Sequence, residues 1–125
     1  MKTILIIEDN YDIRDNTAEI LELADYEIMV AEDGVQGLYK IKERRPDLVL
    51  CDILMPKMNG FEVLRQLKNN PSTVDIPFIY VAASVEKDEV LMAMDMGADG
   101  YIGKPFEVED LIEKVREKMA LLNRE

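Results

Sequence analysis

Five short, largely apolar runs alternate with segments in which apolar residues recur every three or four positions. The runs occupy residues 3–7, 27–31, 48–51, 78–82 and 100–103. Each is bounded by polar residues, glycine or proline, and runs of this length without polar alternation are typical of strands buried on both faces of a parallel sheet. The pattern therefore predicts five strands.

The segments between the runs have helical spacing. After the first run, one face of the predicted helix carries Ile13, Thr17, Ile20, Leu21 and Ala24. After the last run, a longer face carries Val108, Leu111, Ile112, Val115, Met119 and Leu122. We expect Asp12 to cap the first helix. Five alternations of strand and helix favour an α/β fold with a parallel sheet and helices on both faces.

Composition indicates one globular domain spanning residues 1–125. Apolar residues make up 48% of the chain and charged residues 33%, and no repeat or linker interrupts the alternation. The first residues lack the layout of a signal peptide, and no apolar stretch is long enough to span a bilayer, so we expect a cytoplasmic protein without a membrane partner. The absence of histidine and the single Cys51 argue against a disulfide framework and against zinc chemistry.

The formal net charge of −11 excludes a nucleic-acid surface on this domain. Such a surface would be basic, and this chain should repel nucleic acid. One interpretation is that acidity only confers solubility. The other is that some of the acidic side chains crowd together to hold a cation.

Chemically distinctive residues follow four of the predicted strands. Glu8 and Asp9 follow the first, Asp52 the third, Ala82 ends the fourth, and Lys104 follows the fifth. Because carboxyl ends of parallel strands lie along one edge, these side chains should meet. Clustered carboxylates suit Mg²⁺, and with a lysine they suit phosphoryl transfer to a carboxylate. The simpler alternative is a structural salt bridge between Lys104 and Asp52.

Shorter motifs accompany these residues in a fixed order. Met55-Pro56 and Asn59-Gly60 lead from the third strand into the third helix, and Lys104-Pro105 ends the fifth strand. Together with the acidic pair and Asp52, they make the whole chain resemble response-regulator receiver domains of two-component signalling. The chain is similar to stand-alone chemotaxis-type receivers.

The resemblance implies a flavodoxin-like (βα)5 three-layer sandwich with strand order 2-1-3-4-5. It implies that Asp52 is the phosphoacceptor and that Lys104 contacts the phosphoryl group. It also implies that Mg²⁺ is held by Glu8, Asp9, Asp52 and the backbone carbonyl of Leu54. The Lys104–Pro105 peptide bond is expected to be cis.

The resemblance also implies partners. A histidine kinase or phosphotransfer protein would donate the phosphoryl group, and an output protein would bind the face of the fourth helix, fifth strand and fifth helix. Such a domain promotes only its own phosphorylation and dephosphorylation, as a monomer or a weak phosphorylation-dependent dimer. We interpret Met92, Met94 and Met96 of the fourth helix as core filler, with an adaptable docking surface as the alternative.

One position departs from the family pattern. The family has threonine or serine at the end of the fourth strand, where this chain has Ala82, and Tyr101 matches the aromatic switch position. Alanine has no hydroxyl for a phosphoryl oxygen and leaves space, so we expect the Tyr101 ring to lie inward. Two hypotheses stay open: a phosphorylatable receiver, or a degenerate receiver that docks without phosphorylation.

Two further classes fit the sequence less well. An aspartate-nucleophile phosphatase needs a second aspartate two residues after the nucleophile, where this chain has Leu54. A flavodoxin-type cofactor domain would cradle a phosphate in its first loop, and Glu8-Asp9 would repel that phosphate.

Overall fold

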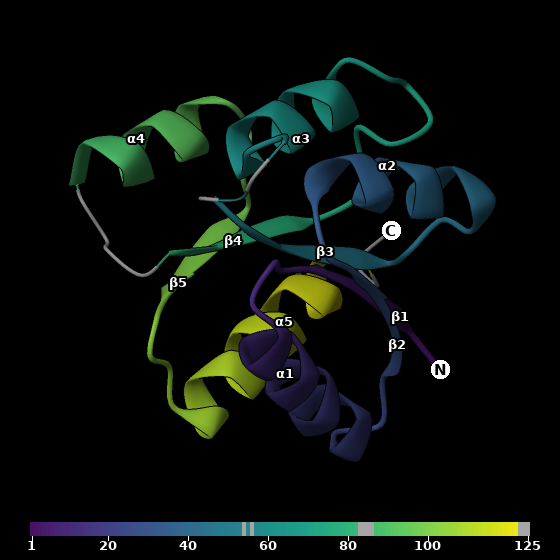
Figure 1. Ribbon diagram of the computed structural model, residues 1–125, viewed down its shortest axis with the longest axis vertical. Helices are drawn as coiled ribbons and strands as arrows, with labels where there is room; N and C mark the ends of the chain where they lie inside the picture. Colours follow the sequence, from purple (N-terminus) through teal and green to yellow (C-terminus); the bar gives the residue numbers. More distant parts are fainter. Residues whose placement is uncertain (54, 56, 83–86, 123–125) are drawn as a thin grey trace.

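A five-stranded parallel sheet forms the centre of the molecule in the computed structural model (Figure 1). The structure describes residues 1–53, 55, 57–82 and 87–122. The strands are β1 (Thr3–Ile7), β2 (Glu27–Ala31), β3 (Leu48–Asp52), β4 (Phe78–Ala82) and β5 (Gly100–Gly103). They lie in the order β2-β1-β3-β4-β5, which confirms the predicted topology.

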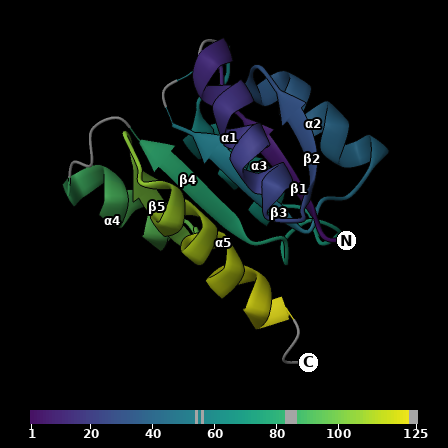
Figure 2. The same cartoon turned by 90° about the horizontal axis from the view of Figure 1, so that it is seen from below.

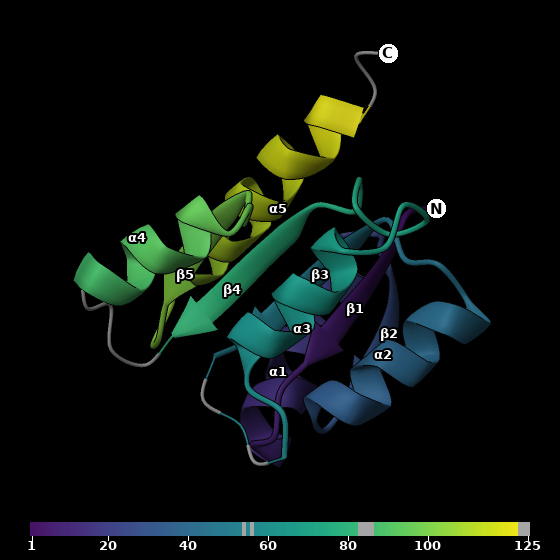
Figure 3. The same cartoon turned by 90° about the horizontal axis from the view of Figure 1, so that it is seen from above.

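Helices cover both faces of this sheet and complete a three-layer sandwich. They are α1 (Tyr11–Leu23), α2 (Gly34–Glu43), α3 (Gly60–Lys68), α4 (Lys87–Asp95) and α5 (Val108–Leu122). Figure 2 shows α1 and α5 on one face, and Figure 3 shows α2, α3 and α4 on the other. The predicted flavodoxin-like architecture is confirmed.

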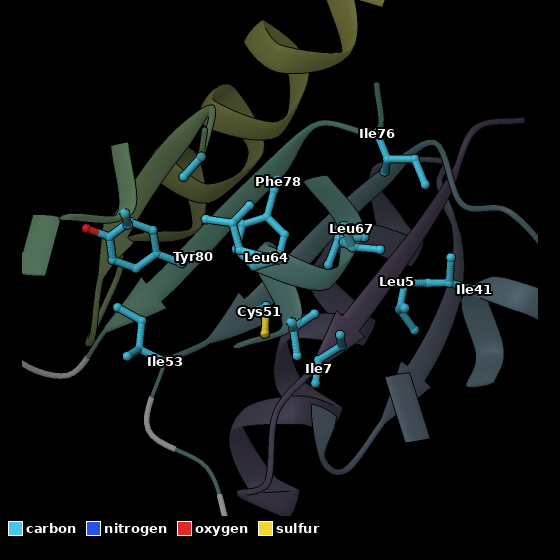
Figure 4. Packing of buried hydrophobic residues seen from close by; sticks show 14 of the residues in the cluster. Leu5, Ile7, Ile41, Cys51, Ile53, Leu64, Leu67, Ile76, Phe78 and Tyr80 are labelled. Atoms are coloured by element: carbon cyan, nitrogen blue, oxygen red, sulfur yellow. The ribbon is translucent and has the colours of Figure 1, made fainter. Parts of the chain in front are cut away.

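Alternate residues of the strands build two separate hydrophobic cores. On β1, Leu5 and Ile7 face α2 and α3 (Figure 4), whereas Ile4 and Ile6 face α1 and α5. Every residue of β1, β3 and β4 is buried. Burying each large aliphatic side chain contributes about 1.5–3 kcal/mol to stability. The central strands are therefore held rigidly, and so are the polar residues at their carboxyl ends.

Asparagine and aspartate side chains fix where three helices begin. Asn10, and not Asp12, caps α1, because its side-chain oxygen accepts the backbone N–H of Ile13 at 3.0 Å. The prediction for Asp12 was wrong by two residues: the helix begins at Tyr11, and Asp12 lies in its first turn. Asp33 and Asn59 cap α2 and α3 in the same way.

The start of α3 is in direct backbone contact with the end of β3. The N–H of Gly60 donates to the carbonyl oxygen of Ile53 at 2.8 Å. A Cβ atom at Gly60 would lie 2.5 Å from the carbonyl oxygen of Asp52 and 2.9 Å from the Cα of Ile53. Only glycine permits this approach, which holds the strand end that carries Asp52.

Replacing Gly60→Ala should therefore destabilise the protein by about 1–3 kcal/mol, because the methyl group forces backbone apart rather than a flexible side chain. Gly100→Ala is the matched control, since the nearest neighbour of a Cβ there would be the flexible Lys118 side chain, at 3.2 Å, and not backbone. Urea unfolding of both variants measures the difference. Equal stability of the two variants would show that the α3–β3 contact can relax.

Candidate functional site

Three carboxylates meet at the carboxyl edge of the sheet. Glu8 and Asp9 directly follow β1, and Asp52 is the last residue of β3. The parallel register pairs Ile7 with Cys51, so the next residues, Glu8 and Asp52, lie side by side. One oxygen from each of the three carboxylates lies within 4.8 Å of the others. The predicted convergence is confirmed.

Burial distinguishes the three acidic residues. Glu8 is 4% exposed and Asp52 6% exposed, whereas Asp9 lies at the surface. Charges of one sign repel one another more strongly as water is excluded. The cluster therefore requires positive charge.

Lys104 supplies part of that charge. Its ammonium nitrogen lies 2.6 Å from Glu8 Oε1 and 3.2 Å from Asp52 Oδ2. Burial alone would lower the pKa of Lys104, but the hydrogen bond to Glu8 and the charge of Asp52 outweigh it and raise that pKa above its ordinary value. The lysine is thus charged at neutral pH. The salt bridge to Asp52 is present, as the simpler reading of the sequence expected, but Lys104 bonds to Glu8 as well.

The backbone around Lys104 fixes its position. Its N–H donates to the carbonyl oxygen of Ala82 at 2.8 Å, which ties the end of β5 to the end of β4. The following Lys104–Pro105 peptide bond is cis, as predicted.

A hydrogen-bonded turn holds Glu8. Its Oε2 accepts the backbone N–H of Asn10 at 3.2 Å, while Oε1 contacts Lys104. Arg14 of α1 donates from Nη1 to the backbone carbonyl oxygen of Glu8 at 2.9 Å. Arg14 was not predicted as a residue of the site. The sequence indicates it only as a basic residue five positions after Asp9.

The donor set fits a hard divalent cation such as Mg²⁺. Such ions prefer oxygen ligands, and Mg²⁺ is commonly bound by one or two carboxylates with retained waters. Glu8, Asp9 and Asp52 are the described residues that could hold it. Leu54, whose carbonyl was predicted as a further ligand, lies outside the described residues.

The predicted switch residues lie on the neighbouring strands. Ala82 ends β4 and is buried, and its side chain is a methyl group without a hydroxyl. Tyr101 on β5 is 40% exposed, and the expectation that its ring lies inward was wrong. Tyr80 and Tyr101 are register partners with ring centroids 6.0 Å apart. The Tyr80 ring on β4 is buried, and the neighbouring Tyr101 ring on β5 lies at the surface.

Tyr101 is one of several exposed apolar or aromatic side chains on α4, β5 and α5. The other members are Leu91, Met92, Met94 and Val108. The interpretation of the methionines as core filler was right for Met96, which packs against the core, and wrong for Met92 and Met94, which are 50% and 42% exposed. This surface, formed by α4, β5 and α5, is termed the α4–β5–α5 face below.

A groove of ≈ 730 Å³ opens beside Lys104. Its lining comes from α1 and from the segment after β5, namely Asp12, Ile13, Asn16, Lys104, Pro105 and Phe106. Lys104 therefore lines this groove and also contacts Asp52. Among the described residues, no helix is long and apolar enough to cross a membrane.

Comparison with known proteins places this site in a family. Residues 4–116 match the model of the response regulator receiver domain. The phosphate regulon transcriptional regulatory protein PhoB of Pseudomonas aeruginosa is 42% identical over 115 residues, covering 92% of this chain and 50% of that protein. The transcriptional regulator RpaA of a Synechocystis strain is 38% identical and is also covered over 50% of its length.

Solved structures agree with the sequence relatives. A CheY-like receiver domain protein from Methanospirillum hungatei superposes with a TM-score of 0.93 at 34% identity, covering 99% of this chain and 98% of that one. The chain spans about half the length of the curated relatives that it matches. On the family match, the sequence identities and the shared fold, the chain belongs to the response-regulator receiver family.

Proposed function

We propose that this domain receives a phosphoryl group on Asp52 and passes the signal on through protein contacts. The observation that supports the proposal is the contact of Lys104 Nζ with Asp52 at 3.2 Å inside a cluster of three carboxylates. A carboxylate oxygen of Asp52 attacks phosphorus, a phosphorus–oxygen bond forms, and the bond to the donor breaks with its electron pair leaving on the donor.

Each neighbouring group has a distinct task in this proposal. Glu8, Asp9 and Asp52, with the carbonyl of Leu54 implied by the family resemblance, would hold Mg²⁺. When bound, that ion supplies charge neutralisation for the phosphoryl oxygens. Lys104 is already within hydrogen-bond distance of Asp52, so its ammonium group can donate to an oxygen of the attached phosphoryl group.

Two separate surfaces serve the partners. The groove beside Lys104 gives a phosphohistidine of a kinase or phosphotransfer protein a path towards Asp52. The α4–β5–α5 face exposes the apolar side chains that an output protein would cover. In this proposal the domain is a cytoplasmic monomer or weak dimer that acts on no substrate except its own phosphoryl group.

A second candidate function rests on one observation. The buried end of β4 presents the methyl group of Ala82, where the family has a hydroxyl. A hydrogen bond to a charged group is worth about 1.5–3 kcal/mol, which is enough to shift a balanced equilibrium between two conformations. Without that bond the domain would act as a docking module whose contacts change little on phosphorylation.

Phosphorylation itself is tested by intact mass after incubation with Mg²⁺ and acetyl phosphate. The native chain should gain one phosphoryl group, and Asp52→Asn should gain none because an amide is a poor nucleophile. Asp47→Asn is the control, since Asp47 lies at the opposite end of β3 and bonds to Thr3. A labelled Asp52→Asn variant would refute the assignment.

Removing the ammonium group tests the metal site without phosphorylation. Lys104→Met should lower the free energy of unfolding by about 1–3 kcal/mol, because Glu8 and Asp52 stay buried without their cation. Added Mg²⁺ should raise the melting temperature more in this variant than in the native chain, since the ion replaces the lost charge. Lys42→Met, at an exposed position on α2, is the control. A Mg²⁺ effect no larger than in the native chain would contradict metal binding by the cluster.

The two candidate functions are separated by Ala82→Thr. Amide hydrogen exchange of residues 82–104 is measured with and without the phosphoryl mimic beryllofluoride. The threonine variant should show a larger difference between the two states than the native chain. Ala82→Val has the shape of threonine without its hydroxyl and should behave like alanine. An equally strong response in the native chain would mean that the missing hydroxyl has no effect.

A further inference from the structure

The arginine that contacts the acidic turn is itself held in place. Arg14 is half-buried on α1, and its Nη1 donates to the backbone carbonyl oxygen of Glu8 at 2.9 Å. Its guanidinium carbon lies 5.5 Å from the centroid of the Tyr11 ring, within the range of a cation–π interaction. Tyr11 is 68% exposed, so most of this residue is open to solvent.

The carbonyl that Arg14 binds belongs to the peptide unit between Glu8 and Asp9. That unit is planar, so fixing its orientation limits the directions in which Asp9 can extend its side chain. Asp9 is the exposed member of the carboxylate cluster, and it has no burial to hold it in place. The position of its carboxylate therefore depends on the backbone.

The same turn is tied at its other end. Asn10 donates its backbone N–H to Glu8 Oε2, caps α1 with its side chain, and accepts the backbone N–H of Arg14 at 2.9 Å. Arg14 thus contacts the turn twice, with its backbone at Asn10 and with its side chain at Glu8. Asp9 lies between these two points.

We propose that Arg14 is a positioning residue for the metal site, which holds the Glu8–Asp9 peptide in the orientation that brings three carboxylates together. Tyr11 acts as the platform that keeps the guanidinium group over the turn. The inference rests on the metal-binding part of the proposed function. Outer groups that orient metal ligands commonly change affinity by roughly 10–100-fold when removed.

Charge and positioning have opposite effects, which makes the role of Arg14 decidable. A guanidinium group near a cation site repels the cation, so an arginine that acted only through its charge would weaken Mg²⁺ binding. Its removal would then tighten binding. If Arg14 positions the carboxylates, its removal weakens binding despite the loss of a positive charge.

Calorimetric titration with Mg²⁺ distinguishes these outcomes. Arg14→Met should weaken Mg²⁺ binding by roughly 10-fold, at the lower end of the range for such outer groups. Arg14→Lys keeps the charge but loses the planar group, and should still bind Mg²⁺ more weakly than the native chain. Tyr11→Phe should bind as the native chain does, and Tyr11→Ala more weakly. Arg116→Met, at an exposed position on α5, controls for loss of one positive charge.

A metal-free measurement keeps this inference separate from the proposed function. Amide hydrogen exchange at Asp9 and Asn10 should be faster in Arg14→Met than in the native chain or in Arg116→Met. Thermal unfolding curves check that all three proteins are folded. If exchange is faster in Arg14→Met but the native chain binds no Mg²⁺, the metal site is refuted while Arg14 remains the residue that orders the turn. Unchanged exchange, or Mg²⁺ binding that is unchanged or tighter in Arg14→Met, overturns the positioning role.

Discussion

The central constraint on this structure is the buried negative charge of Glu8 and Asp52 at the carboxyl edge of the sheet, which Lys104 compensates. Parallel pairing of β1 with β3 places Glu8 beside Asp52, and both carboxylates are nearly inaccessible to water. Lys104, from the far edge strand, reaches across to both of them. A pair of this kind is weak evidence of stability, because removing charges from water costs several kcal/mol per ion. The buried charges are therefore not explained by a gain in stability alone.

Rigid backbone contacts surround this compensated cluster. Gly60 lets α3 approach the carbonyl of Asp52, and the N–H of Lys104 bonds to the carbonyl of Ala82. Arg14 and Asn10 hold the turn after β1. Main-chain contacts therefore surround the described groups at the sheet edge, and Asp52 lies on a strand and not on a loop. Sites built on strands in this way are more precise than sites built on loops.

The sequence predicted the parts of this arrangement that depend on topology. Continuous apolar runs indicate buried parallel strands, and polar residues at their carboxyl ends must then share an edge. The predicted meeting of Glu8, Asp52 and Lys104 at that edge is confirmed. The missed features depend on local geometry. Asn10 and Asp12 are both capping residues, and only the backbone angles choose between them. Tyr101 is exposed on the edge strand β5, whereas its register partner Tyr80 on β4 is buried.

Ala82 offers no hydroxyl, and among the described residues Lys104 is the side chain that links the acidic cluster to the strand edge beside β5. A change of charge at Asp52 acts on the ammonium group of Lys104. Lys104 directly follows β5, and its backbone N–H donates to the carbonyl oxygen of Ala82 at the end of β4. Tyr101 lies on that same strand, within the α4–β5–α5 face. We therefore expect any response to phosphorylation to pass through the main chain of β5. The size of such a response depends on the difference in free energy that the contacts of Lys104 create between the two states.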